Sequence, residues 1–443
     1  MNINAAFKLF DIRGEYPGEV YERMAFVVGK ALTLLRRPRK VLVASDTRES
    51  SPLLKNFLKD GLAEGEARVF DLYEAPVPQF YYTVATGDYD LGVIVTASHV
   101  ADCENGFKIV GPDGLPFDQS EIATLKNLVL QIKNDPIVVP AIESERINST
   151  DEYINTITRL VGKQKFVSKV CLDVTKSAVI TPVMVLFSRL GVNFSLAKSN
   201  RSGSPLLPEN QEDLGKAVVE NNADLGILWD SDGDRVVFLD GTGKMIPLSF
   251  VLACLARSEV AKKKGTGVVV DVRAGLVVRD LVAQAGGSIR VLPAWSQFIK
   301  FAMRENANVV FGGETSGHFI FRDFHCIDDG ILAALRFLSL WEEENVSGLL
   351  TDLKKKYFEL PERNFPCDLK MAPDILERLS ELYRSKEYQV SVEDGLTVFG
   401  QDFKFNLRAS LTEPLLRLNL ETRTEKDSNI ISREIEKHIE ENE

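Results

Sequence analysis

The chain has 443 residues, 44% of them apolar and 26% charged, a composition typical of a globular protein with a well-developed core. Its length exceeds one hydrophobic core, and length alone suggests about three domains. The net charge of −11 argues against broad nucleic-acid binding, so an anionic ligand would need a local cluster of Arg and Lys.

Signals for export or membrane insertion are lacking in the sequence. Residues 1–14 have no apolar signal-peptide core, and no run approaches the roughly 18 apolar residues of a membrane span. The five cysteines are scattered and form no Cys-x-x-Cys pair: Cys103, Cys171, Cys254, Cys326 and Cys367. We therefore expect buried free thiols, a cytoplasmic location and no membrane partner.

Along the chain, short apolar runs rich in β-branched residues alternate with segments of helical periodicity. The predicted strands are 41–44, 91–95, 170–174, 225–229, 268–272 and 309–311. The predicted helices between them are 51–63, 120–132, 209–221 and 248–261. This alternation favours mixed or parallel sheets covered by helices, so the predicted fold class is α/β.

Composition changes indicate boundaries near 134–151, 241–247 and 354–365. Beyond 365 the pattern predicts a helix at 371–385 and strands at 397–407 and 415–421. A polar tail follows Thr424, with His438 in a charged helix. These elements predict a small C-terminal α+β domain.

Ser98 directly follows the predicted strand 91–95, in the sequence Thr96-Ala97-Ser98-His99. Open α/β sheets place reacting groups past the carboxyl ends of their strands, so Ser98 is a candidate nucleophile or phosphoryl carrier. The alternative is a Ser or Thr cap on the next segment. A hydrolase nucleophile elbow is disfavoured because glycine is missing from both sides of the serine.

Lys108 lies in Asn105-Gly106-Phe107-Lys108, for which we predict a turn that leads into a strand. The lysine is either an ordinary exposed side chain or, if it faces a cleft, a group that binds phosphate or transfers a proton.

Residues 230–235 read Asp-Ser-Asp-Gly-Asp-Arg, between the apolar runs 223–229 and 236–239. Three carboxylates this close repel one another, and a divalent cation such as Mg²⁺ relieves the repulsion. The alternative is a solvated acidic turn in which Gly233 supplies a positive φ. An EF-hand is excluded because Arg235 and Gly241 occupy its glycine and glutamate positions.

Two later loops are weaker candidates. Residues 312–318 read Gly-Gly-Glu-Thr-Ser-Gly-His and suit hydrogen bonding to sugar hydroxyls, or form a simple hairpin. Residues 408–414 read Arg-Ala-Ser-Leu-Thr-Glu-Pro, with Arg417 three residues on, and are either a phosphate cradle or a polar turn.

Taken in order, these segments resemble the α-D-phosphohexomutase superfamily, nearest its phosphomannomutase/phosphoglucomutase branch. The resemblance runs from Phe10-Asp11-Ile12-Arg13-Gly14 to residues 408–414, nearly the whole chain. It implies four domains around a central cleft, three similar α/β domains and a smaller C-terminal α+β domain. The corresponding ranges are 1–142, 143–243, 244–356 and 357–443, bearing in turn the phosphoserine, metal, sugar and phosphate loops.

By this resemblance, Ser98 is the phosphoserine, and its phosphate shares Mg²⁺ with Asp230, Asp232 and Asp234. A hexose 1- or 6-phosphate then becomes a bisphosphate that turns end for end and returns its other phosphate to Ser98. Hexose 1,6-bisphosphate is the implied activator.

The resemblance also assigns the remaining site residues. Those associated with the active site and proton transfer are Arg13, Lys108 and His318. Those that bind substrate are Glu314 and Ser316 for the sugar, and Arg408, Ser410, Thr412 and Arg417 for the distal phosphate. The implied partner is a phosphorylated hexose, bound by a monomer or homodimer.

Four loops depart from the family pattern. Val100-Ala101 replaces Asn-Pro, Thr175-Lys176-Ser177 replaces Gly-Asn-Gly, Ala294-Trp295-Ser296 replaces Thr-Gly-His, and Leu411 stands where Asn or Gly is usual. The resemblance as a whole nevertheless predicts a mutase of mannose and/or glucose phosphates. The alternatives are a phosphoglucosamine or other phosphosugar mutase, a sugar-phosphate-binding protein without catalysis, and a phosphatase.

Overall fold

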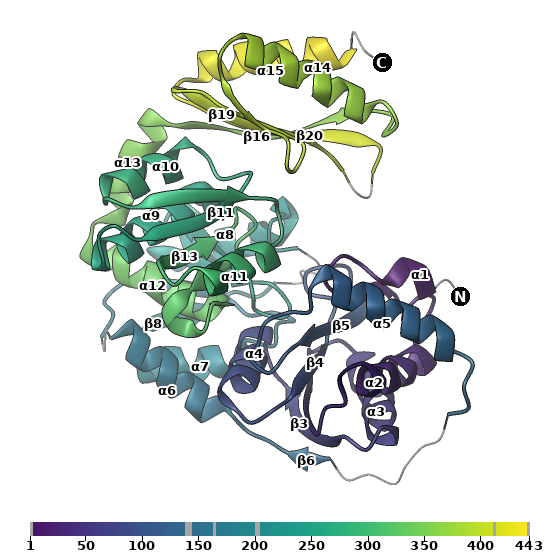
Figure 1. Cartoon of the computed structure of the whole chain (residues 1–443). Helices are drawn as coiled ribbons and strands as arrows, with labels where there is room; N and C mark the ends of the chain where they lie inside the picture. Colours follow the sequence, from purple (N-terminus) through teal and green to yellow (C-terminus); the bar gives the residue numbers. More distant parts are fainter. Residues whose placement is uncertain (1–2, 138–143, 163–164, 200–203, 411–412, 441–443) are drawn as a thin grey trace. The chain divides into compact units, whose positions relative to one another are not determined.

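The computed structural model describes the chain except for residues 1–2, 138–143, 163–164, 200–203, 411–412 and 441–443. The chain forms two compact units, whose elements are labelled in Figure 1. Unit 1 comprises Met1–Ile246 and Ile320–Ser339, and unit 2 comprises Pro247–Phe319 and Leu340–Glu443. The described residues form several mixed and parallel sheets with helices, so the predicted α/β class is confirmed.

Unit 1 begins with a six-stranded sheet of order β1-β5-β4-β2-β3-β6. Its strands are β1 (Ile12–Glu15), β2 (Lys40–Ser45), β3 (Arg68–Glu74), β4 (Leu91–Val95), β5 (Glu104–Val110) and β6 (Glu145–Arg146). Strand β2 is parallel to β3 and β4, whereas β5 is antiparallel to β1 and β4. All five residues of β4 are buried, as expected for a central strand covered on both faces.

Five helices accompany this sheet: α1 (Ile3–Ala6), α2 (Glu22–Arg36), α3 (Ser51–Glu64), α4 (Val77–Thr86) and α5 (Gln119–Ile132). The start of α5 is fixed by a capping box in which Asp118 and Glu121 each accept the other's backbone N–H. Where α2 and α3 cross, a Cβ on Gly61 would lie 1.9 Å from the carbonyl oxygen of Phe26. The helices are therefore closer than any side chain at this position would allow.

The predicted turn at 105–108 is wrong, because these residues lie inside β5. Gly106 serves a close approach between strands: a Cβ there would lie 2.0 Å from the carbonyl oxygen of Ile12 in β1. The amide of Asn105 donates to the hydroxyls of Ser50 and Ser51 instead of supporting a turn.

The rest of unit 1 contains a four-stranded sheet of order β10-β9-β7-β8. Its strands are β7 (Lys169–Asp173), β8 (Asn193–Leu196), β9 (Leu225–Trp229) and β10 (Val236–Asp240). The helices are α6 (Thr150–Val161), α7 (Ile180–Arg189) and α8 (Pro208–Glu220). Strands β9 and β10 are antiparallel and pair Trp229 with Val236, so residues 230–235 form the loop of a hairpin. The segment at 320–339 adds η1 (Arg322–Phe324) and β15 (Ile327–Asp328).

Unit 2 begins with parallel strands: β11 (Gly267–Asp271) pairs with both β12 (Ser288–Leu292) and β13 (Val309–Gly313). Its helices are α9 (Leu248–Lys262), α10 (Leu276–Gln284), α11 (Ser296–Glu305) and α13 (Val346–Lys356). The boundary between the units falls within β14 (Phe319–Phe321) and α12 (Gly330–Glu343).

Unit 2 ends in an antiparallel sheet of order β16-β20-β19-β18-β17, with α14 (Ala372–Ser385) and α15 (Glu425–Glu440) on one face (Figure 1). The strands are β16 (Phe358–Pro366), β17 (Gln389–Ser391), β18 (Leu396–Phe399), β19 (Phe403–Ala409) and β20 (Leu415–Thr422). The predicted strand 397–407 is two strands, β18 and β19. The stretch after Thr424 is not a tail: it is α15, with Ile435 and Ile439 buried in the core of this α+β part.

Within the described part of the chain, every helix is too short or too polar to span a lipid bilayer. The five cysteines are free thiols, of which Cys103 is exposed and the others are buried. The predicted burial is therefore confirmed for four of the five.

We predict that Gly61→Ala lowers the free energy of unfolding by about 1–3 kcal/mol or more, because the methyl group forces α2 away from α3. Chemical denaturation measures the loss. Gly18→Ala is the matched control, since its Cβ would meet no heavy atom closer than 3.6 Å. Equal stability of the two variants would contradict the close helix crossing.

Candidate active site

Ser98 follows β4 in a left-handed backbone conformation, with φ of 58°. A non-glycine residue adopts this conformation only when its surroundings hold it there, and such residues cluster at functional sites. The hydroxyl of Thr96 accepts the backbone N–H of Ser98 at 3.0 Å, so Thr96 caps the turn and Ser98 does not. The Ser98 hydroxyl lies 3.3 Å from Nδ1 of His99.

The acidic loop 230–235 is buried, which excludes the solvated turn. Asp230 and Asp232 are fully buried, and Asp234 is 3% exposed. Gly233 has the expected positive φ, 78°. Oδ1 of Asp230 accepts the backbone N–H of Gly233 at 3.0 Å and of Arg235 at 3.2 Å, which fixes the turn from within.

Neighbouring segments hold this loop in place. The backbone N–H of Val77, at the start of α4, donates to the carbonyl of Asp232 at 2.8 Å. Ser177 donates its hydroxyl to the carbonyl of Asp230 at 2.5 Å. Ser177 belongs to the loop in which this sequence departs from Gly-Asn-Gly, so the departure adds a direct contact to the acidic loop.

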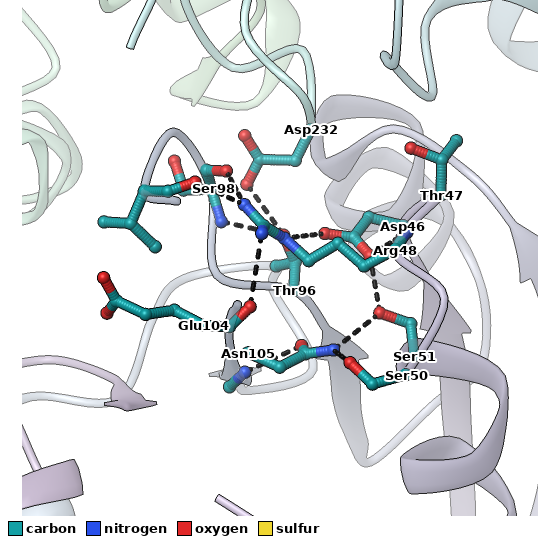
Figure 2. A network of polar contacts seen from close by, with 12 residues as sticks. Asp46, Thr47, Arg48, Ser50, Ser51, Thr96, Ser98, Glu104, Asn105 and Asp232 are labelled. Atoms are coloured by element: carbon teal, nitrogen blue, oxygen red, sulfur yellow. Dashed lines mark hydrogen bonds and ion pairs between the residues drawn. The ribbon is translucent and has the colours of Figure 1, made fainter. Parts of the chain in front are cut away.

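The Ser98 turn and the acidic loop meet, as Figure 2 shows: the hydroxyl of Thr96 donates to Oδ2 of Asp232 at 3.4 Å. Lys108 joins them from β5, where it pairs with Ile94 of β4. Its ammonium donates to Asp232 at 2.7 Å and to Asp234 at 2.6 Å. The structure thus brings together three sequence-predicted groups: Ser98, Lys108 and the three aspartates.

Charge is concentrated at this point. Burial lowers the pKa of Lys108, but Asp232 and Asp234 outweigh burial and hold that pKa well above its ordinary value. Burial, together with repulsion from Asp232 and Asp234, raises the pKa of Asp230 well above its ordinary value. Arg13, in β1, donates a hydrogen bond from its guanidinium to Asp11 at 2.5 Å. Burial lowers the pKa of Arg13, but the charges of Asp11, Asp232 and Asp234 raise it above its ordinary value overall.

The acidic loop fits a divalent cation. One carboxylate oxygen from each aspartate lies within 4.8 Å of the others. Oδ2 of Asp230 and Oδ1 of Asp232 are buried without a hydrogen-bond partner among the described residues, which is costly for a carboxylate unless a cation binds it. Lys108 pairs with Asp232 and Asp234, and Nε of Arg235 lies 3.9 Å from Oδ2 of Asp230. These two side chains offset part of the negative charge, and a hard cation with oxygen ligands would offset the remainder.

In unit 2, Glu314 lies buried between β13 and β14. Its Oε1 accepts the guanidinium of Arg273 at 3.1 Å and the backbone N–H of Trp295 at 2.8 Å. Its Oε2 accepts the hydroxyl of Ser316 at 3.3 Å. His318 is buried in the same loop, and its carbonyl accepts the backbone N–H of Glu314 at 2.9 Å.

The altered loop 294–296 adjoins Glu314. Trp295 has φ of 126°, a conformation suited to glycine, and its N–H bond to Glu314 holds it there. The N–H of Ala294 donates to Asp394 at 2.9 Å, and Asp394 lies 3.9 Å from the guanidinium of Arg408. The loop therefore connects a predicted sugar ligand with a predicted phosphate ligand.

Arg408 and Arg417 face each other across β19 and β20. Like charges directly opposite destabilise a strand pair unless anions offset them. Here Asp394 lies 3.9 Å from Arg408, and Glu413 pairs with Arg417 at 2.7 Å, so acidic side chains offset both guanidinium groups. Burial, and then Arg273, lowers the pKa of Arg408. The hydroxyl of Ser410 accepts the N–H of Glu413 at 3.3 Å. Thr412, also predicted for the cradle, lies outside the described residues.

Sequence reasoning missed Asp46, Arg48 and Arg273. All three lie just past the carboxyl ends of parallel strands, β2 or β11, the same signal that identified Ser98. Applied to every predicted strand, that rule finds them.

Comparisons with known proteins agree with this geometry. Residues 4–135 match "Phosphoglucomutase/phosphomannomutase, alpha/beta/alpha domain I", and residues 249–357 match domain III of the same description. A protein of Xanthomonas campestris pv. campestris named "Phosphohexose mutases" is 32% identical over 94% of this chain and 95% of its own. A "Phosphomannomutase" of Methanocaldococcus jannaschii is 31% identical over 95% and 94%.

Among solved structures, a phosphoglucomutase/phosphomannomutase family protein from Burkholderia thailandensis has the same fold, with a TM-score of 0.87 and 24% identity over 99% of this chain and 97% of its own. The fold and these matches define an α/β isomerase of the phosphosugar mutase class. More particularly, the chain belongs to the phosphoglucomutase/phosphomannomutase family of the α-D-phosphohexomutase superfamily, as its sequence predicts.

We predict that the protein binds Mn²⁺, which serves here as a spectroscopic substitute for Mg²⁺. Asp232→Asn should weaken this binding by about 10–100-fold or more, because the substitution removes the charge of one metal ligand. Electron paramagnetic resonance of free Mn²⁺ measures the affinity. The control is Asp224→Asn, which changes an exposed carboxylate directly before the first residue of β9, at the end of the strand away from the acidic loop. Equal affinity in the two variants would refute a metal site at the acidic loop.

Proposed function

We propose that this chain interconverts hexose 1-phosphate and hexose 6-phosphate, of mannose and/or glucose, through a phosphoserine at position 98 and a bisphosphorylated sugar. The observation that supports this most is the position of Ser98. It lies in a strained turn at the end of β4, linked through Thr96 to a buried loop of three carboxylates. A protein that only binds sugar phosphates needs neither a phosphoryl carrier nor this buried charge.

Asp230, Asp232 and Asp234 would hold Mg²⁺, whose charge, when it is bound, offsets that of the phosphoryl oxygens on Ser98. Lys108 holds two of these carboxylates and adds a fixed positive charge at the same point. Arg13 supplies another cation from β1. Phosphoryl transfer depends on such charge neutralisation and on alignment more than on covalent chemistry by the protein.

The proposed transfer forms one P–O bond and breaks another. A sugar hydroxyl attacks phosphorus, a new P–O bond to the sugar forms, and the bond from phosphorus to the Ser98 oxygen breaks. The hydroxyl proton passes to the serine oxygen, and His318 is the side chain proposed to relay it. Repeating the step in reverse with the other phosphate of the bisphosphate restores phosphoserine and releases the isomer.

The residues of unit 2 would bind the sugar phosphate. Glu314, held as a hydrogen-bond acceptor by Arg273 and Trp295, and Ser316 suit sugar hydroxyls. Arg408, Arg417, Ser410 and Thr412 are proposed to bind the distal phosphate, which Arg pairs recognise through charge-assisted hydrogen bonds.

We also propose the four-domain division at 1–142, 143–243, 244–356 and 357–443. Three of its ranges each contain one complete sheet, which supports the division. Two observations do not fit it: β6 (Glu145–Arg146) pairs with β3 of the first sheet, and residues 320–339 group with unit 1. A cytoplasmic location is proposed because the cysteines are free thiols and relatives include bacterial phosphomannomutases. A monomeric or homodimeric state stays a prediction.

We predict that the purified protein turns over mannose 1-phosphate or glucose 1-phosphate in a coupled assay with Mg²⁺ and a trace of hexose 1,6-bisphosphate. After incubation with the bisphosphate, its intact mass should include one phosphate group. Ser98→Ala should lose both properties, because the carrier hydroxyl is gone.

Ser188→Ala, which changes an exposed serine of α7, should keep both. A Ser98→Ala variant that remains active would contradict the phosphoserine route. A wild-type protein that releases inorganic phosphate without forming isomer would favour the phosphatase alternative.

We predict that Arg408→Ala raises KM by about 10-fold or more and leaves kcat within about threefold, since a charge-assisted hydrogen bond to phosphate contributes about 1.5–3 kcal/mol. Steady-state kinetics with the preferred sugar phosphate measures both constants. The control Arg433→Ala changes an exposed arginine of α15. An unchanged KM in Arg408→Ala would count against the phosphate cradle.

A further inference from the structure

The guanidinium of Arg48 contacts the backbone of the loop that contains Ser98. It follows β2, and its side chain is only 5% exposed. Figure 2 shows its guanidinium among Asp46, Ser98 and Glu104. This arginine had no role in the sequence prediction.

Arg48 uses every N–H of its guanidinium. Nη2 donates to the carbonyls of Ser98 at 2.7 Å and Val100 at 2.9 Å. Nη1 donates to the carbonyls of Ala101 at 2.8 Å and Glu104 at 3.2 Å. Nε donates to Oδ2 of Asp46 at 3.2 Å. With all five donors occupied, this group has none left for a phosphate, so it acts on the backbone of the loop.

The guanidinium is itself held in place. Oδ1 of Asp46 accepts the backbone N–H of Arg48 at 3.1 Å and the hydroxyl of Ser51 at 2.6 Å. Ser51 also accepts the amide of Asn105 at 3.0 Å. Asp46 is fully buried, so the ion pair is shielded from water. These bonds connect the end of β2, the start of α3 and β5 around the Ser98 loop.

The loop needs such support. Between β4 and β5 the chain runs through turns, and Ser98 has a positive φ without being glycine. A strained residue keeps its conformation only where its surroundings fix it more than once. Arg48 does so at four carbonyls between residues 98 and 104. Lysine cannot replace it, because a single ammonium lacks the planar fork that reaches several acceptors at once.

We infer that Arg48 is a positioning residue for the phosphoryl carrier. Its fork fixes the backbone from Ser98 to Glu104, so the Ser98 oxygen keeps the alignment that transfer requires in both halves of the reaction. The inference rests on the proposed mutase function. In this segment the sequence departs from its family at Val100-Ala101. The guanidinium of Arg48 donates a hydrogen bond to the backbone carbonyl of each of these two residues.

The test is Arg48→Lys in the full-length protein. Misplacement of a reacting group by about 1 Å can cost about 10²-fold in rate, so we expect kcat to fall about 10–100-fold and KM to stay within about twofold. Phosphorylation of Ser98 by glucose 1,6-bisphosphate, followed by intact mass in a single turnover, should slow by the same factor. A merely structural role would lower the melting temperature without this selective loss of kcat.

Arg23→Lys is the matched control. Arg23 also donates to two backbone carbonyls, those of Lys133 and Asp135, but at the end of α5. Its kcat, KM and phosphorylation rate should equal those of the wild type.

The outcomes are distinguishable. A wild-type protein inactive on all the sugar phosphates would overturn the proposed function, and this inference with it. With an active wild type, Arg48→Lys with kcat within about threefold, or with a raised KM alone, would overturn the inference only. If Arg48→Lys does not fold, Asp46→Asn takes its place in the test. This variant removes the negative charge that pairs with the guanidinium of Arg48. An unchanged kcat in Asp46→Asn would equally refute the positioning role.

Discussion

Mutual repulsion within the acidic loop is the constraint on which unit 1 depends. Asp230, Asp232 and Asp234 are buried within five residues of one another, and burial together with the charges of Asp232 and Asp234 raises the pKa of Asp230. Lys108 enters from β5 to offset one charge, and the turn consumes one oxygen of Asp230. What is left is a set of carboxylate oxygens that could hold a cation. A loop of this kind is costly unless it serves a function.

The second element is a hydroxyl held in an unfavourable backbone conformation beside that charge. Ser98 lies at the end of a fully buried strand, capped by Thr96 and fixed by Arg48 from beneath. Rigid strands supply the position and polar side chains supply the orientation, so the hydroxyl is already held in place for the phosphoryl transfer that we propose. Glu314, in unit 2, follows the same principle, since Arg273 and the N–H of Trp295 fix its carboxylate.

Much of this was predictable from the sequence, because strand–loop–helix alternation is local information. The helices at 51–63 and 248–261 are found within one residue of their predicted bounds. Ser98 was a candidate from its place after a strand, with a cap as the alternative, and the family resemblance gave it the role of phosphoserine. The acidic loop was a candidate from its composition. The failures have a tertiary cause: Asn105-Gly106 reads as a turn, but Gly106 permits the close approach of β1. Arg48 escaped notice because its acceptors are carbonyls, which no side-chain pattern reveals.

The central claim is that one divalent cation is shared by the acidic loop and the phosphate on Ser98. Phosphorus NMR of the phosphorylated protein with added Mn²⁺ tests it most directly, because the unpaired electrons of Mn²⁺ broaden nearby phosphorus signals. The account predicts a phosphoserine resonance that is broadened by Mn²⁺ in the wild type and stays sharp in Asp230→Asn. A sharp resonance in wild-type protein whose acidic loop has bound Mn²⁺ would contradict it.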